Sequence, residues 1–249
     1  MRIENIKFNN SDIEKALCMS ETIWSGSDDK TGSPGPKKLI GGNMEAGFFG
    51  EVPARDFITG KDLSNMLGFT NGLILYSEEP WLKFAYLGKI EFIPKKPLRN
   101  FVAWWFLSAR RLVNGNKIVE IKGKRYKVRL IKGKTEGKQD DKSSCKGSIN
   151  YNSEWNRLML PIHKDAPSSW DYPENVNSPT ENWNIGYTDA DLMLNYKEGE
   201  GTYTWCQEYG ETENLRLYKG FRGVSYSSSG LSDEDSRHQS WRPVLELVD

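Results

Sequence analysis

The sequence predicts an α+β fold made mostly of short strands and long loops, preceded by a short N-terminal arm. Residues 81–93 and 117–131 each alternate apolar and polar side chains around a turn, which is typical of half-buried β-hairpins. Residues 59–68 and 101–112 carry helix signals instead. From residue 150 onward the alternation fades, and loops rich in Asn, Ser, Gly and Tyr separate short aromatic segments.

The first 40 residues are predicted to form a docking arm and a linker. Residues 10–12 offer capping side chains for a short helix over 13–17. Residues 25–36 are small, polar and rich in Pro and Gly, a composition that cannot bury enough apolar surface to fold alone. Such a tethered segment suits docking onto a neighbouring protein, and a frayed terminus fits the same composition.

The rest of the chain is predicted to divide at residue 134, with a hairpin-containing subdomain over 41–134 and a second domain over 135–249. The alternative is one unit over 41–249. In the first segment, Thr59 caps a short helix that Gly68 closes. Residues 101–112 lack turn-forming side chains and are predicted to form a buried helix.

The second hairpin and the residues after it, 117–134, carry a stripe of cations. Such a stripe could hold phosphate or an acidic glycan. It is also typical of a solvated outer strand, on which cations discourage edge-to-edge pairing. The cations concerned are Lys122, Lys124, Arg125, Lys127, Arg129, Lys132 and Lys134.

Composition excludes several classes of partner. Lys and Arg together number 34, as do Asp and Glu, so neither nucleic acid nor an anionic membrane is expected as the main partner. The start lacks a signal-like apolar stretch and no segment is apolar enough for a membrane span, so we expect synthesis in the cytoplasm. Hydrophobic residues make up only 37%, and nine Trp indicate a core that depends on large rings.

Cysteine and histidine usage argues against a metal centre built from those residues. Cys18, Cys145 and Cys206 lie far apart, without metal-ligand spacing or a disulfide-scaffold count, and are expected to be buried thiols. His163 and His238 are too few for a histidine-rich site.

Aromatic and arginine side chains are predicted to fasten the C-terminal loops. An indole ringed by short turns usually packs into the core. Each arginine beside such a tryptophan is expected to pair with a buried carboxylate, Glu154 or Glu208, so that Arg242→Ala causes misfolding. These structural anchors are Trp155, Arg157, Trp205, Trp241 and Arg242.

Residues 216–226 and 241–246 together resemble the ending of the formylglycine-generating-enzyme type of the C-type lectin fold. The family ends on R-x-x-R-G-G-S-W and later G-F-R, whereas this chain has Gly-Val-Ser-Tyr at 223–226 and Trp-Arg-Pro at 241–243. The resemblance implies a C-type-lectin-like C-terminal domain. It does not imply the activity, because that oxidation needs a cysteine pair and Cys206 stands alone near the C-terminus.

A resemblance to virion structural proteins of phages of Gram-positive bacteria covers residues 40–249. It implies a non-enzymatic structural component of a phage particle, located in the virion and made in the host cytoplasm. Its partners would be other virion proteins and a glycan or protein of the host surface, and a homo-oligomer, with a trimer as the guess, is expected. The matching blocks are 47–53, 81–86, 95–99, 126–130, 154–159, 187–192, 203–208 and 241–247.

The loop over 226–239 is the candidate binding surface. In lectin-like folds such a loop lies on the exposed binding face, and its Ser, Tyr and Gly side chains suit adaptable recognition. Tyr226, Arg237 and His238 are the candidate ligand-binding residues, and a plain solvated loop is the alternative.

No cofactor is required by the sequence, and calcium is the metal expected if one binds. Asp189, Asp191 and Asn195 offer the carboxylate and amide oxygens that calcium prefers. Capping and turn formation are the more ordinary use of such residues.

The resemblance implies the first two of three candidate functions, and the paired carboxylates give the third. The first is a tail, baseplate or fibre-tip protein that binds the host surface or neighbouring virion proteins. The second is a head-decoration or lattice subunit. The third is a cell-wall hydrolase that uses two carboxylates such as Glu208 and Asp189.

Overall fold

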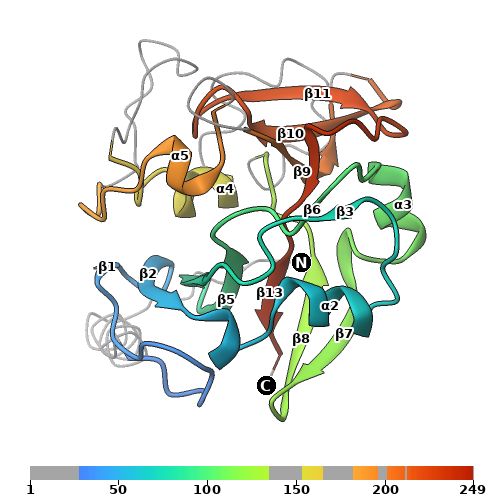
Figure 1. The fold of residues 1–249 in the computed structure, drawn as a ribbon. Coiled ribbons are helices and arrows are strands. Elements are labelled where there is room, and N and C mark those ends of the chain that lie inside the picture. Colours follow the sequence, from blue (N-terminus) through green and yellow to red (C-terminus); the bar gives the residue numbers. More distant parts are fainter. Residues whose placement is uncertain (1–27, 135–152, 165–181, 196–200, 211, 249) are drawn as a thin grey trace, which may run out of the picture.

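Two β-sheets carry the fold of this protein in a computed structural model (Figure 1). The structure describes residues 28–134, 153–164, 182–195, 201–210 and 212–248. The predicted α+β class, with its loop-rich lectin-like C-terminal domain, is wrong, because strands dominate both halves of the described chain and its α-helices have at most seven residues. The proposed helix over 13–17 lies outside the described residues.

One sheet has seven strands. Its strands are, in spatial order, β1 (Gly41–Gly42), β2 (Ala46–Val52), β4 (Trp81–Tyr86), β5 (Lys89–Pro94), β13 (Val244–Leu247), β8 (Lys124–Arg129) and β7 (Asn114–Ile121). All neighbours in it are antiparallel.

The other sheet has six strands. They are, in spatial order, β11 (Ser227–Leu231), β10 (Leu215–Gly220), β9 (Tyr203–Tyr209), β12 (Gln239–Trp241), β6 (Arg99–Asn100) and β3 (Leu73–Ile74). Only the β9–β12 pair is parallel among them.

The helices are short and lie in the connections. They are η1 (Ala54–Asp56), α2 (Gly60–Met66), α3 (Trp104–Ala109), α4 (Glu154–Leu158) and α5 (Asp189–Leu192). The Thr59 cap is confirmed, since its side chain accepts the Asp62 N–H. The helix expected over 101–112 is shorter than predicted. No helix within the described ranges has the length and apolar character needed to cross a membrane.

Both predicted hairpins are confirmed. β4 and β5 are joined by Leu87–Gly88, and β7 and β8 by Lys122–Gly123. All four turn residues have positive φ, the pattern of the two-residue turn whose twist matches that of the strands.

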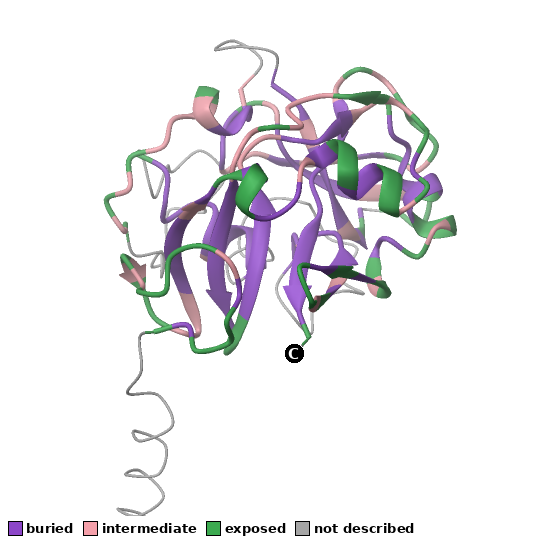
Figure 2. Ribbon diagram, turned by 60° about the horizontal axis from the view of Figure 1, so that its bottom comes forward, coloured by how far each residue is buried: buried purple, intermediate pink, exposed green. Residues whose placement is uncertain are grey.

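The seven-stranded sheet lies between two hydrophobic clusters. Successive strand residues point to opposite faces. Phe48 and Leu82 pack in one cluster, whereas their neighbours Phe49 and Trp81 pack in the other. β4 is therefore buried along its whole length, and Figure 2 shows the burial concentrated on the paired strands.

Strands from both halves of the sequence alternate in space. β13 lies between β5 and β8, while β12 lies between β9 and β6. The segments 41–134 and 135–249 thus contribute to both sheets, and the proposed boundary at residue 134 stays a prediction.

Residues 28–38 are packed on the seven-stranded sheet, so the linker expected over 25–36 is not an extended spacer in its described part. Asp29 and Lys83 form a buried ion pair of 2.7 Å. The Lys83 ammonium also donates to the backbone oxygens of Pro34 and Pro36. Lys83 of β4 therefore binds this segment both at Asp29 and at the prolines that follow it.

Replacing Asp29 by asparagine is expected to lower the free energy of unfolding by about 3 kcal/mol, because Lys83 would stay buried without a countercharge. Although burial opposes it, hydrogen bonds from Lys83, Thr31 and Ser33 lower the pKa of Asp29 well below its usual value. The stabilisation is therefore present at neutral pH and is lost as the pH falls through the acidic range. Urea unfolding tests this, with Asp28→Asn as the exposed control.

Candidate functional site

A cluster of aromatic rings lies where β9, β10 and the approach to β12 meet. We call Tyr203, Tyr218, Phe221, Tyr226 and His238 the tyrosine cluster. The Tyr203 ring centroid is 3.9 Å from that of Tyr218 and 4.2 Å from that of Phe221, and the Phe221 and His238 centroids are 4.9 Å apart. Tyr203, Phe221, Tyr226 and His238 are only half-buried, so the cluster reaches the surface.

Backbone geometry at the end of β10 positions this cluster. Gly220 has φ of 87°, and a Cβ there would lie 2.8 Å from Leu194 Cδ2, so only glycine fits. Phe221 follows with φ of 74°, a conformation that bulky residues rarely adopt. Strain of this kind concentrates at functional sites, which makes the turn a candidate site.

Hydrogen-bonding groups surround the rings. Burial and the neighbouring Tyr218 hydroxyl raise the pKa of Tyr203, and burial also raises that of Tyr218, so both hydroxyls keep their protons at neutral pH. The exposed Arg222 guanidinium lies 5.3 Å from the centroid of the Tyr226 ring. The cluster thus combines apolar ring faces with phenol and guanidinium donors.

The structure brings two of the three predicted binding residues into this cluster. Tyr226 and His238 belong to it, while the exposed Arg237 lies at its border and donates from Nε to His238 Nε2 at 3.1 Å. Sequence reasoning missed Tyr203 and Phe221. The glycines flanking Phe221 and Arg222 were the available signal, because they mark a turn with unusual backbone angles.

The three calcium candidates lie on and beside α5, where they already contact protein groups. Asp191 completes a capping box with Thr188. Asp189 Oδ1 is 3.3 Å from His163 Nε2, and its Oδ2 is 3.4 Å from Asn195 Nδ2. Within the described residues, no group of three or more His, Cys, Asp and Glu side chains is placed to hold a metal ion.

The three anchor tryptophans are fully buried. Trp155 Nε1 donates to the backbone oxygen of Val224 at 2.7 Å, and Trp205 Nε1 donates to that of Val102, also at 2.7 Å. The Trp155 and Trp205 indoles therefore each connect two chain segments far apart in sequence, whereas Nε1 of the buried Trp241 has no hydrogen-bond partner among the described residues.

The arginine anchors do not make the expected contacts with Glu154 or Glu208. Arg157 lies over the Tyr86 ring and donates to the backbone oxygen of Glu45. Arg242 is buried and donates only to the backbone oxygen of Leu192, and its Nε and Nη1 have no hydrogen-bond partner within the described chain. Burial lowers the pKa of Arg242 to about 9.

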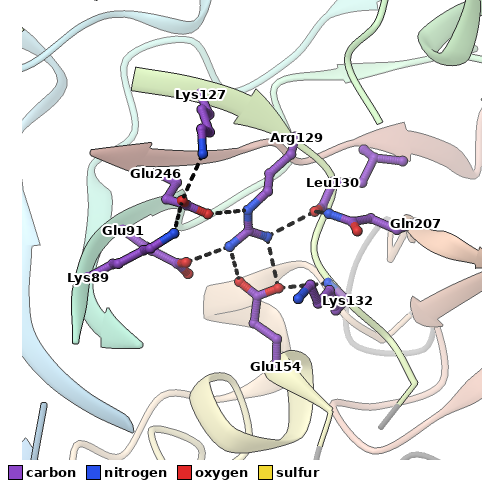
Figure 3. Close-up of polar contacts among 9 residues, drawn as sticks. All are labelled: Lys89, Glu91, Lys127, Arg129, Leu130, Lys132, Glu154, Gln207 and Glu246. Atoms are coloured by element: carbon purple, nitrogen blue, oxygen red, sulfur yellow. Dashed lines mark hydrogen bonds and ion pairs between the residues drawn. The ribbon is translucent and has the colours of Figure 1, made fainter. Parts of the chain in front are cut away.

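The carboxylate Glu154 instead pairs with Arg129, at the centre of a buried charge network (Figure 3). Both terminal guanidinium nitrogens of Arg129 bind Glu154, at 2.7 and 2.9 Å. The same side chain contacts Glu91 at 2.5 Å and Glu246 at 3.1 Å. One arginine therefore joins β8 to β5, β13 and α4.

The buried part of the network contains three carboxyl groups and one guanidinium group. Burial raises the pKa of Glu91 well above its usual value. Burial acts in the same direction on Glu154, but the bidentate contact with Arg129 lowers its pKa overall. Burial therefore favours the protonated form of Glu91 and the Arg129 contact favours the charged form of Glu154. At the outer side, Lys89 Nζ contacts Glu246 at 2.6 Å.

The two carboxylates considered for hydrolysis are not presented together on a surface. Glu208 is buried and accepts the Gly133 N–H at 2.9 Å, and Asp189 contacts His163. Burial raises the pKa of Glu208 to about 7. The Glu208 carboxyl group therefore holds the backbone that follows β8 by a hydrogen bond.

Glu208 gives a pH-dependent prediction. Because its folded-state pKa lies above the ordinary 4.5, its contribution to stability declines by about 3 kcal/mol as the pH rises from about 4.5 to about 7. Glu208→Gln should remove this contribution, so the difference in unfolding free energy between wild type and variant should change across that pH window. A pH-independent difference would contradict it, and Glu120→Gln is the exposed control.

The cations of 117–134 do not form one open stripe. Arg129 is buried in the network, and Lys134 is also buried. Lys127 Nζ lies 3.7 Å from Glu246, and Lys122 Nζ donates to the backbone oxygen of Arg55. The exposed cations of the β7–β8 hairpin are Lys117, Lys122 and Arg125.

Comparisons with protein-family models, curated proteins and solved structures found no match to this chain. The function is therefore inferred from the geometry and chemistry of the tyrosine cluster. Its combination of stacked rings, polar donors and a strained turn is typical of recognition surfaces.

Proposed function

We propose that this protein is a non-enzymatic structural component of a phage particle that binds a glycan or protein of the host surface through the tyrosine cluster. The resemblance of residues 40–249 to virion structural proteins supports the place in the particle. The tyrosine cluster is the observation that supports binding: the His238 ring contacts Phe221 in a strained, partly exposed turn, and Tyr226 closes that turn by accepting the Gly220 N–H through its backbone oxygen.

The chemistry of the cluster suits a sugar or a polar protein loop. The half-buried rings of Phe221 and Tyr226 offer apolar contact area that costs little side-chain entropy on binding, and Tyr203 stacks behind Phe221. Arg222 and Arg237 are exposed donors that can bind hydroxyl or carboxylate oxygens of a ligand.

Simultaneous replacement of Tyr226, Arg237 and His238 by alanine is expected to reduce adsorption of particles by about tenfold or more, because aromatic and arginine side chains dominate binding energies. Particle-bound copies of the variant should stay at the wild-type number. The control is Tyr209→Ala/Arg111→Ala, which removes an exposed tyrosine and an exposed arginine elsewhere. Unchanged adsorption at unchanged occupancy contradicts the binding role.

A head-decoration or lattice position is the alternative place in the particle. Copy number separates the two positions: a tail, baseplate or fibre-tip protein is present in a few to some dozens of copies, and a lattice subunit in hundreds. In either position, we propose other virion proteins as partners and a homo-oligomer, with a trimer as the working expectation.

The proposal of a non-enzymatic role has its own test. Clearing of host cell walls by the purified chain, lost on Glu208→Gln or Asp189→Asn, would overturn it. The buried position of Glu208 favours a structural use of this carboxyl group.

A further inference from the structure

A second surface exposes several large apolar side chains. We call Leu73, Phe101, Trp105 and Leu231 the Phe101 patch; they are 60%, 40%, 52% and 54% exposed. Protein surfaces that gather such side chains usually mark an interaction site. A single exposed apolar residue needs no explanation, whereas a group of neighbouring ones does.

Backbone contacts bring the members of this patch together. Leu73 pairs with Asn100 across β3 and β6, and Phe101 follows directly. The backbone N–H of Trp105 donates to the backbone oxygen of Ser232 at 2.9 Å, and Ser232 follows Leu231. The segment from Ser232 to Arg237 then runs to Asn100, whose Nδ2 donates to the Arg237 oxygen at 3.2 Å. Apolar side chains therefore border one loop.

Phe101 adds an independent observation. Its φ is 53°, in the left-handed region that a bulky residue rarely adopts, and yet its ring is partly exposed. Core packing alone does not explain a strained residue of this kind at the surface. Strained residues cluster at binding and switching sites, which makes Phe101 the centre of a contact surface.

The charges around the patch select its partner. The bordering loop carries Asp233, Glu234 and Asp235, all exposed. The β7–β8 hairpin of the same chain carries complementary charge: exposed Ile118 pairs across the strands with Lys127, Arg125 lies on the same face opposite Glu120, and the turn adds exposed Lys122. β7 is also an edge strand, with no described strand on its outer side.

We infer that the Phe101 patch binds the β7–β8 hairpin of a second copy of this chain. Ile118 of one copy packs against Phe101 and Trp105 of the other, and the hairpin cations lie beside Asp233 and Asp235. This contact goes beyond the binding role of the tyrosine cluster and does not depend on it. The contact also assigns a binding role to the exposed cations of the β7–β8 hairpin.

Sedimentation velocity of the purified full chain tests the contact. The wild type is expected to associate in a concentration-dependent manner, and more weakly at high salt. Phe101→Asn should weaken association by about tenfold or more, while the unfolding midpoint stays unchanged or rises, because Asn tolerates positive φ. Leu87→Asn changes an exposed apolar residue with positive φ in the β4–β5 turn, outside the Phe101 patch, and should associate as the wild type does.

Charge reversal tests the partner itself. Asp233→Lys/Asp235→Lys and Lys122→Glu/Arg125→Glu should each weaken association by about tenfold or more, and a chain carrying all four changes should recover it. A wild type that stays monomeric at every concentration overturns the inference. Association that survives Phe101→Asn, or a four-fold variant that fails to recover it, does the same. Normal adsorption in these variants would leave the tyrosine-cluster proposal intact.

Discussion

Replacing Arg129 by methionine is expected to prevent the protein from folding. Among the described residues, Arg129 is the one cation that contacts Glu91, Glu154 and Glu246 together, and all three carboxyl groups are buried. Removing one partner of a buried ion pair costs about 3–5 kcal/mol. Here one substitution leaves the buried Glu154 without its cation and removes a donor from Glu91 and Glu246, so the loss reaches the lower end of the total stability of about 5–15 kcal/mol of an ordinary domain.

Arg129→Lys keeps this prediction testable if the methionine variant yields no folded protein. A lysine restores the charge but not the planar fork that binds Glu154 through two nitrogens. We expect a folded protein whose urea midpoint lies well below that of the wild type. Lys127→Met, at the outer side of the network, should cost far less. A wild-type midpoint for Arg129→Lys would contradict the account of the network.

Replacing Arg242 by methionine is expected to stabilise the protein by about 1–4 kcal/mol. The guanidinium is fully buried, it has no carboxylate partner within the described chain, and burial holds its pKa at about 9. Because this folded-state pKa lies below the ordinary 12.5, the charged form destabilises the fold, and at neutral pH the full effect is present. Methionine fills the same volume without a charge.

Arg242→Ala provides the contrast. It removes the charge as methionine does, but it leaves a cavity among Leu192 and its packed neighbours. We therefore expect Arg242→Ala to unfold at a lower temperature than Arg242→Met, as calorimetry would show. If methionine also destabilises the protein, the buried guanidinium has a binding partner that stabilises it.

Local patterns predicted the hairpins but not the class of the fold. Period-two alternation and the pairs Leu87–Gly88 and Lys122–Gly123 specify two hairpins within short stretches of sequence. β11 could not be recognised, because its serines lack any apolar alternation and its conformation depends on pairing with β10. The last described residues form two strands, because Arg242 and Pro243 separate β12 of one sheet from β13 of the other.

The candidate sites, like the fold, could be predicted only in part. Burial of Trp155, Trp205 and Trp241 followed from their chemistry and is confirmed. The partners of the buried carboxylates did not follow, because Arg129 reaches residues 25, 38 and 117 positions away in the sequence. Composition favours burial or exposure of a side chain, whereas a charge network depends on which strands become neighbours.

A cryo-EM map of the purified phage particle, read together with its copy number, tests the central claim most directly. We expect density for this chain on the particle, with Tyr203, Phe221 and Tyr226 either facing outward or in contact with a neighbouring protein. Absence of the chain from purified particles would contradict a structural role in the virion. A tyrosine cluster buried within the chain's own fold would contradict its role in binding.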